Sequence, residues 1–460
     1  MNVSTNPATG ETFAQFALHD RAFVDATLDA AAKAQRVWRW SSPETRSALL
    51  RRLAEGLRRE RDTLAAMITA EMGKPIGEAR GEVEKCATNC DFYAGAAAAM
   101  LADAPVAGVP EAIVAYEPIG VVLAIMPWNY PLWQVVRFLA PALAAGNGAI
   151  LKHAANVSQC AEAIARLVSE AGAPEGLFAS LRVEAEAVAG IIADPRIAAV
   201  TLTGSTEVGM IVASQAGGAL KKQVLELGGS DPFIVLADAD IAQAARMAVA
   251  ARFTNAGQSC VNAKRFIVVD AVADRFIEAF TAATGALMMG DPTDAATSLG
   301  PLARENLRAA IDRQVQRSAA SGARILTGGT VPDRPGFFYP PTLLDRVVPG
   351  MAAFDEETFG PAAAIIRAAD ETEAIALANR TAFGLGASIW TGDADRGLAV
   401  ARRIDAGAVF INAMVASDPR VPFGGIKMSG YGRELGDLGI REFTNAKTIR
   451  SAAPIVERAA

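Results

Sequence analysis

Short, apolar runs rich in β-branched residues alternate with helix-like segments along most of this chain. Such runs occupy 121–125, 149–151, 198–202 and 233–236, and helical patterns separate them. A strand that is apolar on both faces must be covered on both faces, which is typical of a parallel sheet flanked by helices. The sequence therefore predicts an α/β protein with doubly wound parallel sheets.

The composition is that of a large globular protein. The chain has 460 residues, 51% of them hydrophobic and 20% charged, with a formal net charge of −6. This mild acidic balance, without a basic run, argues against nucleic acid or an anionic membrane surface as a partner. No stretch of about 20 apolar residues predicts a membrane-spanning helix. We expect a soluble protein whose partner is a small molecule.

Histidine and cysteine are scarce, which narrows the possible chemistry. The two histidines, His19 and His153, lie far apart in the sequence, so a Ser-His-Asp triad or a histidine-rich metal site is poorly supplied. We predict no metal site. Four cysteines in a chain of this length do not form a disulfide framework. We therefore expect a reducing compartment, the cytoplasm.

The chain divides into two α/β series. The first hundred residues are helical in pattern, notably 46–60 and 64–71. Strand-like runs then begin at 121, and a second series begins near 232, after the glycine pair 228–229. We expect two doubly wound units joined at that pair, with a strand-like arm at 111–117 and a short tail at 444–451.

Cys260 is the first candidate for chemistry. A lone cysteine is most often a buried, inert small hydrophobe. Cys260 instead lies among small and polar residues in FTNAGQSCVNAKR, 253–265, between a helical segment and a strand. A loop at that place exposes a thiol and directs backbone N–H groups at an atom bonded to its sulfur. Because histidine is scarce, we expect the accompanying base to be a carboxylate.

Glu226 and Asn129 are candidates to assist the thiol. Glu226 ends a strand-like run before the glycine pair, where parallel sheets bind ligands, although a solvated glutamate at a strand end is the alternative. Asn129 lies between a strand and the following helix. It either caps that helix or stabilises the oxyanion that forms when a thiolate attacks a carbonyl.

Two further segments suit a nucleotide. GSTEVG, 204–209, follows a strand and opens a helix, whose N-terminus can hold a pyrophosphate, although G-x-G-x-x-G occurs nowhere in the chain. Lys152 follows the strand 149–151, where it either reaches ribose hydroxyls or stays solvated.

Six motifs together resemble the aldehyde dehydrogenase superfamily, in the family's order and at its spacing over nearly the whole chain. They are PWNYP at 127–131, LTGSTEVG at 202–209, LELGG at 225–229, GQSC at 257–260, ETFGP at 357–361 and PFGG at 422–425. The resemblance implies a dinucleotide-binding domain from 1–106 and 118–228 and a catalytic domain from 229–428. It also implies an oligomerisation arm and C-terminal tail from 107–117 and 429–460, and a homodimer or homotetramer.

The resemblance also implies roles for individual residues. Cys260 would be the nucleophile, Glu226 the general base and Asn129 part of the oxyanion hole. The aldehyde would be oxidised through a thiohemiacetal and a thioester that water hydrolyses. The residues that would bind the dinucleotide are Ile125, Met126, Trp128, Lys152, Ala155, Gly204, Ser205, Leu227, Gly228, Glu357 and Phe359.

Within the superfamily the chain is most like the short bacterial succinate-semialdehyde dehydrogenases, through 133–137, 152–154 and 412–425. Arg137 lies eight residues after Asn129 on the predicted helix and would bind a substrate carboxylate bidentately. Alternatively, Arg137 pairs with an internal acid. The resemblance places Trp133, Ser259 and Ser417 in the same substrate pocket.

Two positions depart from the patterns of relatives. Thr254 stands where larger semialdehyde enzymes have a second arginine, which leaves Arg137 as the expected carboxylate ligand, helped by Ser417 or a backbone N–H. Asn262 stands where some relatives have a second cysteine, so we expect no redox disulfide with the nucleophile.

Cofactor choice depends on the residue facing the adenosine ribose. Enzymes that use NAD often place an acidic residue there, which repels a 2′-phosphate. The equivalent position here is Ala155, three residues after Lys152. We therefore expect NAD or NADP to serve. Oxidation of another aliphatic or aromatic aldehyde, a silent dinucleotide-binding relative and a cofactor-independent thiol hydrolase are the alternative functions.

Overall fold

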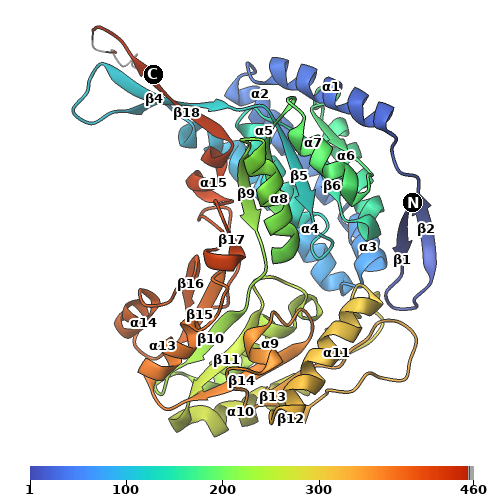
Figure 1. Cartoon of the computed structure of the whole chain (residues 1–460), viewed down its shortest axis with the longest axis vertical. Coiled ribbons are helices and arrows are strands. Elements are labelled where there is room, and N and C mark those ends of the chain that lie inside the picture. Colours follow the sequence, from blue (N-terminus) through green and yellow to red (C-terminus); the bar gives the residue numbers. More distant parts are fainter. Residues whose placement is uncertain (454, 456–460) are drawn as a thin grey trace.

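Two large sheets, each covered by helices, dominate the computed structural model, which describes residues 1–453 and 455 (Figure 1). The first sheet has six strands. Their order is β17 (Gly430–Tyr431), β9 (Lys222–Glu226), β8 (Ile197–Thr203), β5 (Val121–Met126), β6 (Gly148–His153) and β7 (Phe178–Ser180). All neighbours run parallel except β17, which is antiparallel to β9.

The second sheet has seven strands. Their order is β12 (Arg324–Thr327), β13 (Thr342–Asp345), β14 (Ala362–Ala368), β11 (Ala263–Val269), β10 (Asp231–Val235), β15 (Gly386–Trp390) and β16 (Ala408–Ile411). Only β12 is antiparallel to its neighbour. The predicted α/β class is confirmed, because the runs that are apolar on both faces form buried central strands such as β5 and β11.

Helices cover the first sheet. They are α1 (Arg21–Trp38), α2 (Pro43–Arg59), α3 (Arg61–Met72), α4 (Ile76–Met100), α5 (Trp133–Ala144), α6 (Ser158–Glu170), α7 (Ala185–Ala193) and α8 (Thr206–Gly218). The helices predicted at 46–60 and 64–71 correspond to α2 and α3. Gly73, at φ 79°, ends α3 in the left-handed conformation that glycine adopts without strain.

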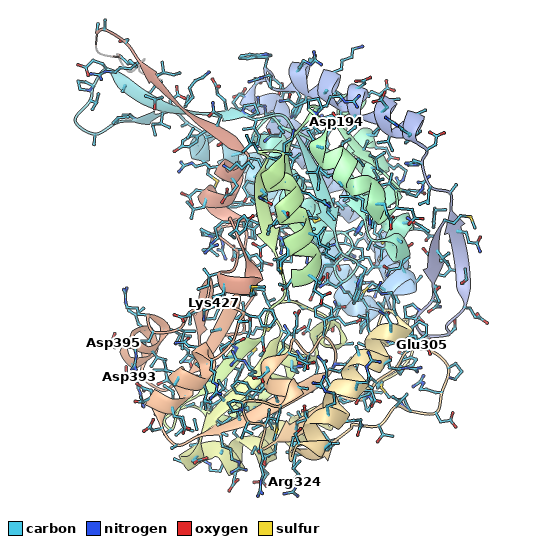
Figure 2. All side chains as sticks on the ribbon, viewed as in Figure 1. Asp194, Glu305, Arg324, Asp393, Asp395 and Lys427 are labelled. Atoms are coloured by element: carbon cyan, nitrogen blue, oxygen red, sulfur yellow. The ribbon has the colours of Figure 1, made fainter. Side chains whose placement is uncertain are left out.

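Helices around the second sheet complete the fold. They are α9 (Ile241–Phe253), α10 (Asp270–Thr284), α11 (Glu305–Ala320), α12 (Ala352–Asp355), α13 (Glu371–Asn379) and α14 (Ala394–Ala401). Figure 2 labels Glu305, the first residue of α11, and Lys427, which lie on opposite sides of the molecule near the level where its two halves meet.

The prediction that the first hundred residues are helical is wrong at the N-terminus. Strands β1 (Asn2–Thr5) and β2 (Thr12–Phe16) form an antiparallel hairpin there. Its register shifts between Ser4 and Thr5, which interrupts the simple alternation of a strand pair. The hairpin is anchored by Ser4, whose hydroxyl donates a hydrogen bond of 2.6 Å to the buried Glu71 of α3.

A three-stranded sheet projects from the body (Figure 1). It pairs β3 (Ala104–Pro105) and β18 (Thr444–Arg450) with the two edges of β4 (Ala112–Pro118). The strand-like pattern at 111–117 thus corresponds to β4, and the tail at 444–451 forms its partner. Residues 454 and 456–460 of the predicted tail lie outside the described residues.

The domain boundaries remain a prediction. Two elements of the C-terminal segment lie against the first α/β unit rather than in the arm. The segment 429–460, assigned to the arm and tail, contains β17, which belongs to the first sheet, and α15 (Gly436–Glu442), which contacts α4 and α5. Within the described part of the chain, no helix is long and apolar enough to cross a membrane.

Candidate functional site

The loop that carries Cys260 has an unusual backbone. Asn255, Ala256 and Gly257, in the 3-10 segment Thr254–Gly257, all have positive φ, of 57°, 52° and 73°. The loop also packs tightly, because a Cβ at Gly257 would collide with the carbonyl oxygen of Gly360. Non-glycine residues in this conformation cost free energy and need support from their surroundings. That support comes from an amide network and a buried lysine.

The amide network joins this loop to the loop that follows β5. The side chain of Asn129 donates a hydrogen bond of 3.0 Å to the carbonyl of Gln258, and the side chain of Asn255 donates one of 2.8 Å to the carbonyl of Asn129. Asn129 does not cap α5, whose N-cap is Leu132. The alternative role of Asn129 as a helix cap is therefore wrong, and its amide lies beside the loop of Cys260.

Lys264 supports the same loop through hydrogen bonds to its carbonyl groups. Its ammonium group, fully buried, donates hydrogen bonds to the carbonyls of Ser259, Cys260 and Asn262 at 3.2, 2.7 and 3.3 Å. It also lies 3.7 Å from the carboxylate of Glu357. With its carbonyls turned toward Lys264, the loop is held in one arrangement around the thiol.

Cys260 lies between two cavities and lines both of them. One, of about 250 Å³, is lined by Pro127, Trp128, Asn129, Thr203, Gly204, Ser205, Leu227, Gly228, Cys260, Arg304, Leu307, Glu357 and Phe359. The other, of about 200 Å³, is lined by Lys85, Tyr130, Trp133, Gln134, Arg137, Thr254, Ser259, Cys260, Val261, Asn262, Met414, Val415, Ala416, Ser417 and Phe423. We call them the nucleotide-side cavity and the substrate-side cavity.

The nucleotide-side cavity brings together seven of the predicted dinucleotide-binding residues: Trp128, Gly204, Ser205, Leu227, Gly228, Glu357 and Phe359. The rings of Trp128 and Phe359 meet edge to face at 5.9 Å. The other four, Ile125, Met126, Lys152 and Ala155, lie outside this cavity, at or just after the carboxyl ends of β5 and β6. Burial lowers the pKa of the Lys152 ammonium, and Ala155 is exposed.

The shape and donors of this cavity fit a dinucleotide. A Cβ at Gly228 would lie 2.5 Å from the carboxylate of Glu357, so only glycine leaves this wall open. Ser205 caps α8, accepting a hydrogen bond from Val208 N–H. The remaining N–H groups of that first turn have no helical partner, and a helix N-terminus of this kind can bind a phosphate.

The surroundings of the Cys260 thiol favour its protonated form. Burial raises the pKa of this thiol to about 11, and the negative charges of Glu226 and Asp231 act in the same direction. Arg137 and Lys264 oppose them. A thiol in this state needs a base or a bound cofactor's charge before it can attack a carbonyl.

Glu226 ends β9, 2% exposed, and its two carboxylate oxygens have no hydrogen-bond partner among the described residues. Burial and the neighbouring carboxylate of Glu434 raise the pKa of the Glu226 carboxyl well above its usual range. A Cβ at Gly424 would lie 2.7 Å from Glu226 Oε1. Because the side chain is buried, the alternative of a solvated glutamate at a strand end is wrong. The side chain lines neither cavity, and its role as a base remains a prediction.

Arg137 faces the substrate-side cavity and also pairs with an internal acid, so the structure contains both environments that the sequence suggested. It lines the substrate-side cavity together with the predicted Trp133, Ser259 and Ser417. It also forms a buried ion pair with Glu434, donates a hydrogen bond of 3.3 Å to the Thr203 hydroxyl and stacks 4.8 Å from the Phe423 ring centroid. The internal acid of the alternative interpretation is therefore Glu434.

Sequence reasoning gave several residues that line the cavities no role, and three of them lie outside every motif and segment that it singled out. Lys85 of α4 lines the substrate-side cavity, and Arg304 and Leu307, at the start of α11, line the nucleotide-side cavity. The spacing of charged residues in the sequence could have indicated Lys85. Glu78, Glu82 and Lys85 recur at helical spacing, so one face of a predicted helix would carry charge. Among the described residues, no cluster of three or more metal-ligating side chains occurs.

Comparisons with known proteins identify the family of this chain. The model of the aldehyde dehydrogenase family matches residues 2–449, and the chain belongs to that family. A probable succinate-semialdehyde dehydrogenase [NADP(+)] of Synechocystis is 51% identical over 96% of this chain and 98% of its own length. The succinate semialdehyde dehydrogenase [NAD(P)+] Sad of Escherichia coli is 48% identical over 97% of each chain.

Solved structures are similarly close. The succinic semialdehyde dehydrogenase of Streptococcus pyogenes, crystallised with NADP+ as the cofactor, superposes with a TM-score of 0.96. It is 38% identical, and the match covers 98% of this chain and all of the other. The predicted superfamily is thus confirmed.

Replacing Arg137 tests how much the fold depends on its pair with Glu434. The Arg137→Leu variant leaves a buried carboxylate without its cation, so we expect the free energy of unfolding to fall by up to about 3–5 kcal/mol. Urea denaturation measures the change. The Arg137→Lys variant keeps a cation and should lose less. An unchanged stability in Arg137→Leu would contradict the structural role of the pair.

Proposed function

We propose that this chain oxidises succinic semialdehyde to succinate with NAD or NADP. The observation that carries the proposal is the position of Cys260, which lines both the nucleotide-side and the substrate-side cavity. A nucleophile there can bind an aldehyde from one side and present it to a dinucleotide on the other. The names of the relatives support succinic semialdehyde as the substrate. Another aliphatic or aromatic aldehyde is the second candidate, with Arg137 serving only the fold.

The first step forms a covalent bond to Cys260. The Cys260 thiol first loses its proton to solvent, the thiolate attacks the aldehyde carbon, the S–C bond forms, and the carbonyl electrons move to oxygen. The side-chain amide of Asn129 and the backbone N–H of Cys260 would hold that oxyanion, which is worth several kcal/mol in comparable sites. Asn129 can donate a hydrogen bond to the oxyanion, because only one of its two amide protons is used in the bond to Gln258.

When bound, the nicotinamide ring supplies the hydride acceptor that this oxidation needs. With that acceptor in place, collapse of the oxyanion would break the C–H bond, expel the hydride and leave a thioester on Cys260. Trp128, Glu357 and Phe359 would hold the nicotinamide end, and Gly204 and Ser205 the pyrophosphate, because these residues line the cavity beside the thiol.

Glu226 would complete the reaction as the base that activates water. It takes a proton from water, the water oxygen bonds to the acyl carbon, and the S–C bond breaks to release the acid and the Cys260 thiolate. Since Glu226 lines neither cavity, the side chain must turn from its buried position toward the thioester. Its raised pKa implies that hydrolysis accelerates as the pH rises and the carboxyl ionises.

The Glu226→Gln variant separates the two halves of the reaction. We expect a burst of reduced nicotinamide of about one per active site, followed by steady turnover at least 10²-fold slower than in the wild type. Stopped-flow absorbance records both phases. The Cys260→Ala variant should show neither phase. Unchanged steady turnover in Glu226→Gln would show that another group activates the water.

The substrate is tested by comparing two aldehydes of equal chain length. The kcat/KM for succinic semialdehyde should exceed that for butanal by about 10²-fold or more, because a desolvated charge pair contributes roughly 2–5 kcal/mol. Spectrophotometric initial rates give both constants. Equal values would leave the aldehyde dehydrogenase activity standing and overturn the choice of substrate.

The cofactor proposal rests on the surroundings of Lys152. No acidic side chain occupies position 155, and Lys152 offers a cation to a 2′-phosphate. The Ala155→Glu variant should lower kcat/KM with NADP by about 10-fold or more and leave that with NAD within about twofold, because a carboxylate repels the phosphate. The Ala155→Gln variant, of similar size, is the matched control. Equal losses with both cofactors would contradict the placement of the ribose.

We also propose that the chain assembles into a homodimer or homotetramer and works in the cytoplasm. The projecting sheet of β3, β4 and β18 offers strand edges for pairing, and Met210 and Ile211 expose apolar surface on α8. Light scattering from the purified chain gives the mass of the assembly. All four cysteines are free thiols, which suits a reducing compartment.

A further inference from the structure

We propose that Lys85 is the residue that binds the carboxylate of the substrate, with Ser417 as its partner, and so sets the preference for a semialdehyde. The inference rests on the proposed function, because it assigns a subsite within the same substrate-side cavity. It also revises the expectation that Arg137, helped by Ser417 or a backbone N–H, supplies the cation that recognises the carboxylate.

Lys85 reaches the cavity from α4. Its ammonium group donates a hydrogen bond of 2.7 Å to the Ser417 hydroxyl and lies 4.3 Å from the centroid of the Trp133 ring. All three side chains line the substrate-side cavity, whose wall also contains Cys260. An aldehyde bonded to the thiol therefore shares one small chamber with this cation. A volume of about 200 Å³ suits a short molecule rather than a drug-sized one of roughly 300–1,000 Å³.

The donor geometry suits a carboxylate. The ammonium group has three protons, and only one is used on Ser417. The Ser417 hydroxyl, accepting from Lys85, keeps its own proton to donate. Two donors thus converge where one carboxylate could accept from both. Hydrogen bonds of this charged kind are about twice as strong as neutral ones.

Lys85 has no carboxylate partner of its own in the described part of the chain, where no ion pair within 4.0 Å involves it. Arg137, the other cation of the chamber, is paired with Glu434 and bonded to Thr203. Asp418, the acid that follows Ser417, is paired with Arg420. A partly desolvated cation without a counter-ion is costly, and an anionic ligand would offset that cost.

The charges around Lys85 favour the binding of an anion next to it. Burial and the positive charges of Arg137, on α5, and Lys74 lower the pKa of Lys85 to about 8. Glu82 and Cys86, on its own helix, act in the opposite direction. The hydrogen bond from Arg420 lowers the pKa of the Asp418 carboxyl to about 2, and the charge of Lys85 acts in the same direction. A bound carboxylate would stabilise the protonated ammonium.

The Lys85→Met variant removes the charge and keeps the length of the side chain. We expect kcat/KM for succinic semialdehyde to fall by about 10²-fold, mainly through a higher KM, while that for butanal stays within about threefold of the wild type. The Lys85→Arg variant should recover part of the loss. Lys33→Met, at an exposed site on α1, is the matched control and should change neither constant.

The outcomes separate this inference from the proposed function. A wild-type preference for succinic semialdehyde that survives Lys85→Met would overturn the role of Lys85 and leave the proposed function standing. A wild type without that preference would overturn both, because the chamber would then bind no carboxylate.

A second measurement needs no variant, and so stands if Lys85→Met fails to fold. The protonated ammonium binds the carboxylate, so the ratio of kcat/KM for succinic semialdehyde to that for butanal should fall as the pH rises through about 8. Titration of Cys260 and Glu226 changes kcat/KM for both aldehydes by the same factor, so its effect cancels in the ratio. A ratio that stays constant from pH 7 to well above 8 would overturn the proposal.

Discussion

Hydrogen bonds between the Asn129 and Cys260 loops hold the two halves of this molecule in register. Asn129 donates to the carbonyl of Gln258, and Asn255 donates back to the carbonyl of Asn129. Asn129 follows a strand of the first sheet, whereas Gln258 and Asn255 precede a strand of the second. The distance between Asn129 and Cys260, the proposed oxyanion donor and nucleophile, therefore depends on the contact between the two halves, and the strained loop is stable only while that contact lasts.

Helix α4 is the scaffold under this contact. Glu82, paired with the buried Lys74, accepts hydrogen bonds of 2.9 and 3.0 Å from the N–H groups of Leu132 and Trp133, and so fixes the start of α5. Glu78 accepts one of 2.7 Å from the N–H of Asn255. The same helix thus positions the residues on both sides of the substrate-side cavity. Buried carboxylates that accept several N–H bonds are costly to remove, which favours a rigid chamber.

The sequence predicted the sheets well, because a strand buried on both faces must be apolar at every position. Local motifs singled out Cys260, Glu226 and Asn129 as candidates, and their roles remain predictions; the motifs did not indicate where the Glu226 side chain lies. The pair of Arg137 with Glu434 joins segments far apart in the chain, and no local periodicity connects them. The N-terminal hairpin was missed because its strands are short and only partly apolar, with a shifted register.

Lys85 lies on a helix of 25 residues, whereas the groups proposed to make and break bonds lie on two loops and at a strand end. Recognition and chemistry therefore occupy separate pieces of the chain. In evolution, a change at this one position of the helix would alter which aldehydes are accepted without disturbing the proposed attack, hydride transfer or hydrolysis. Such a division lets a lineage explore new substrates while retaining a working catalyst.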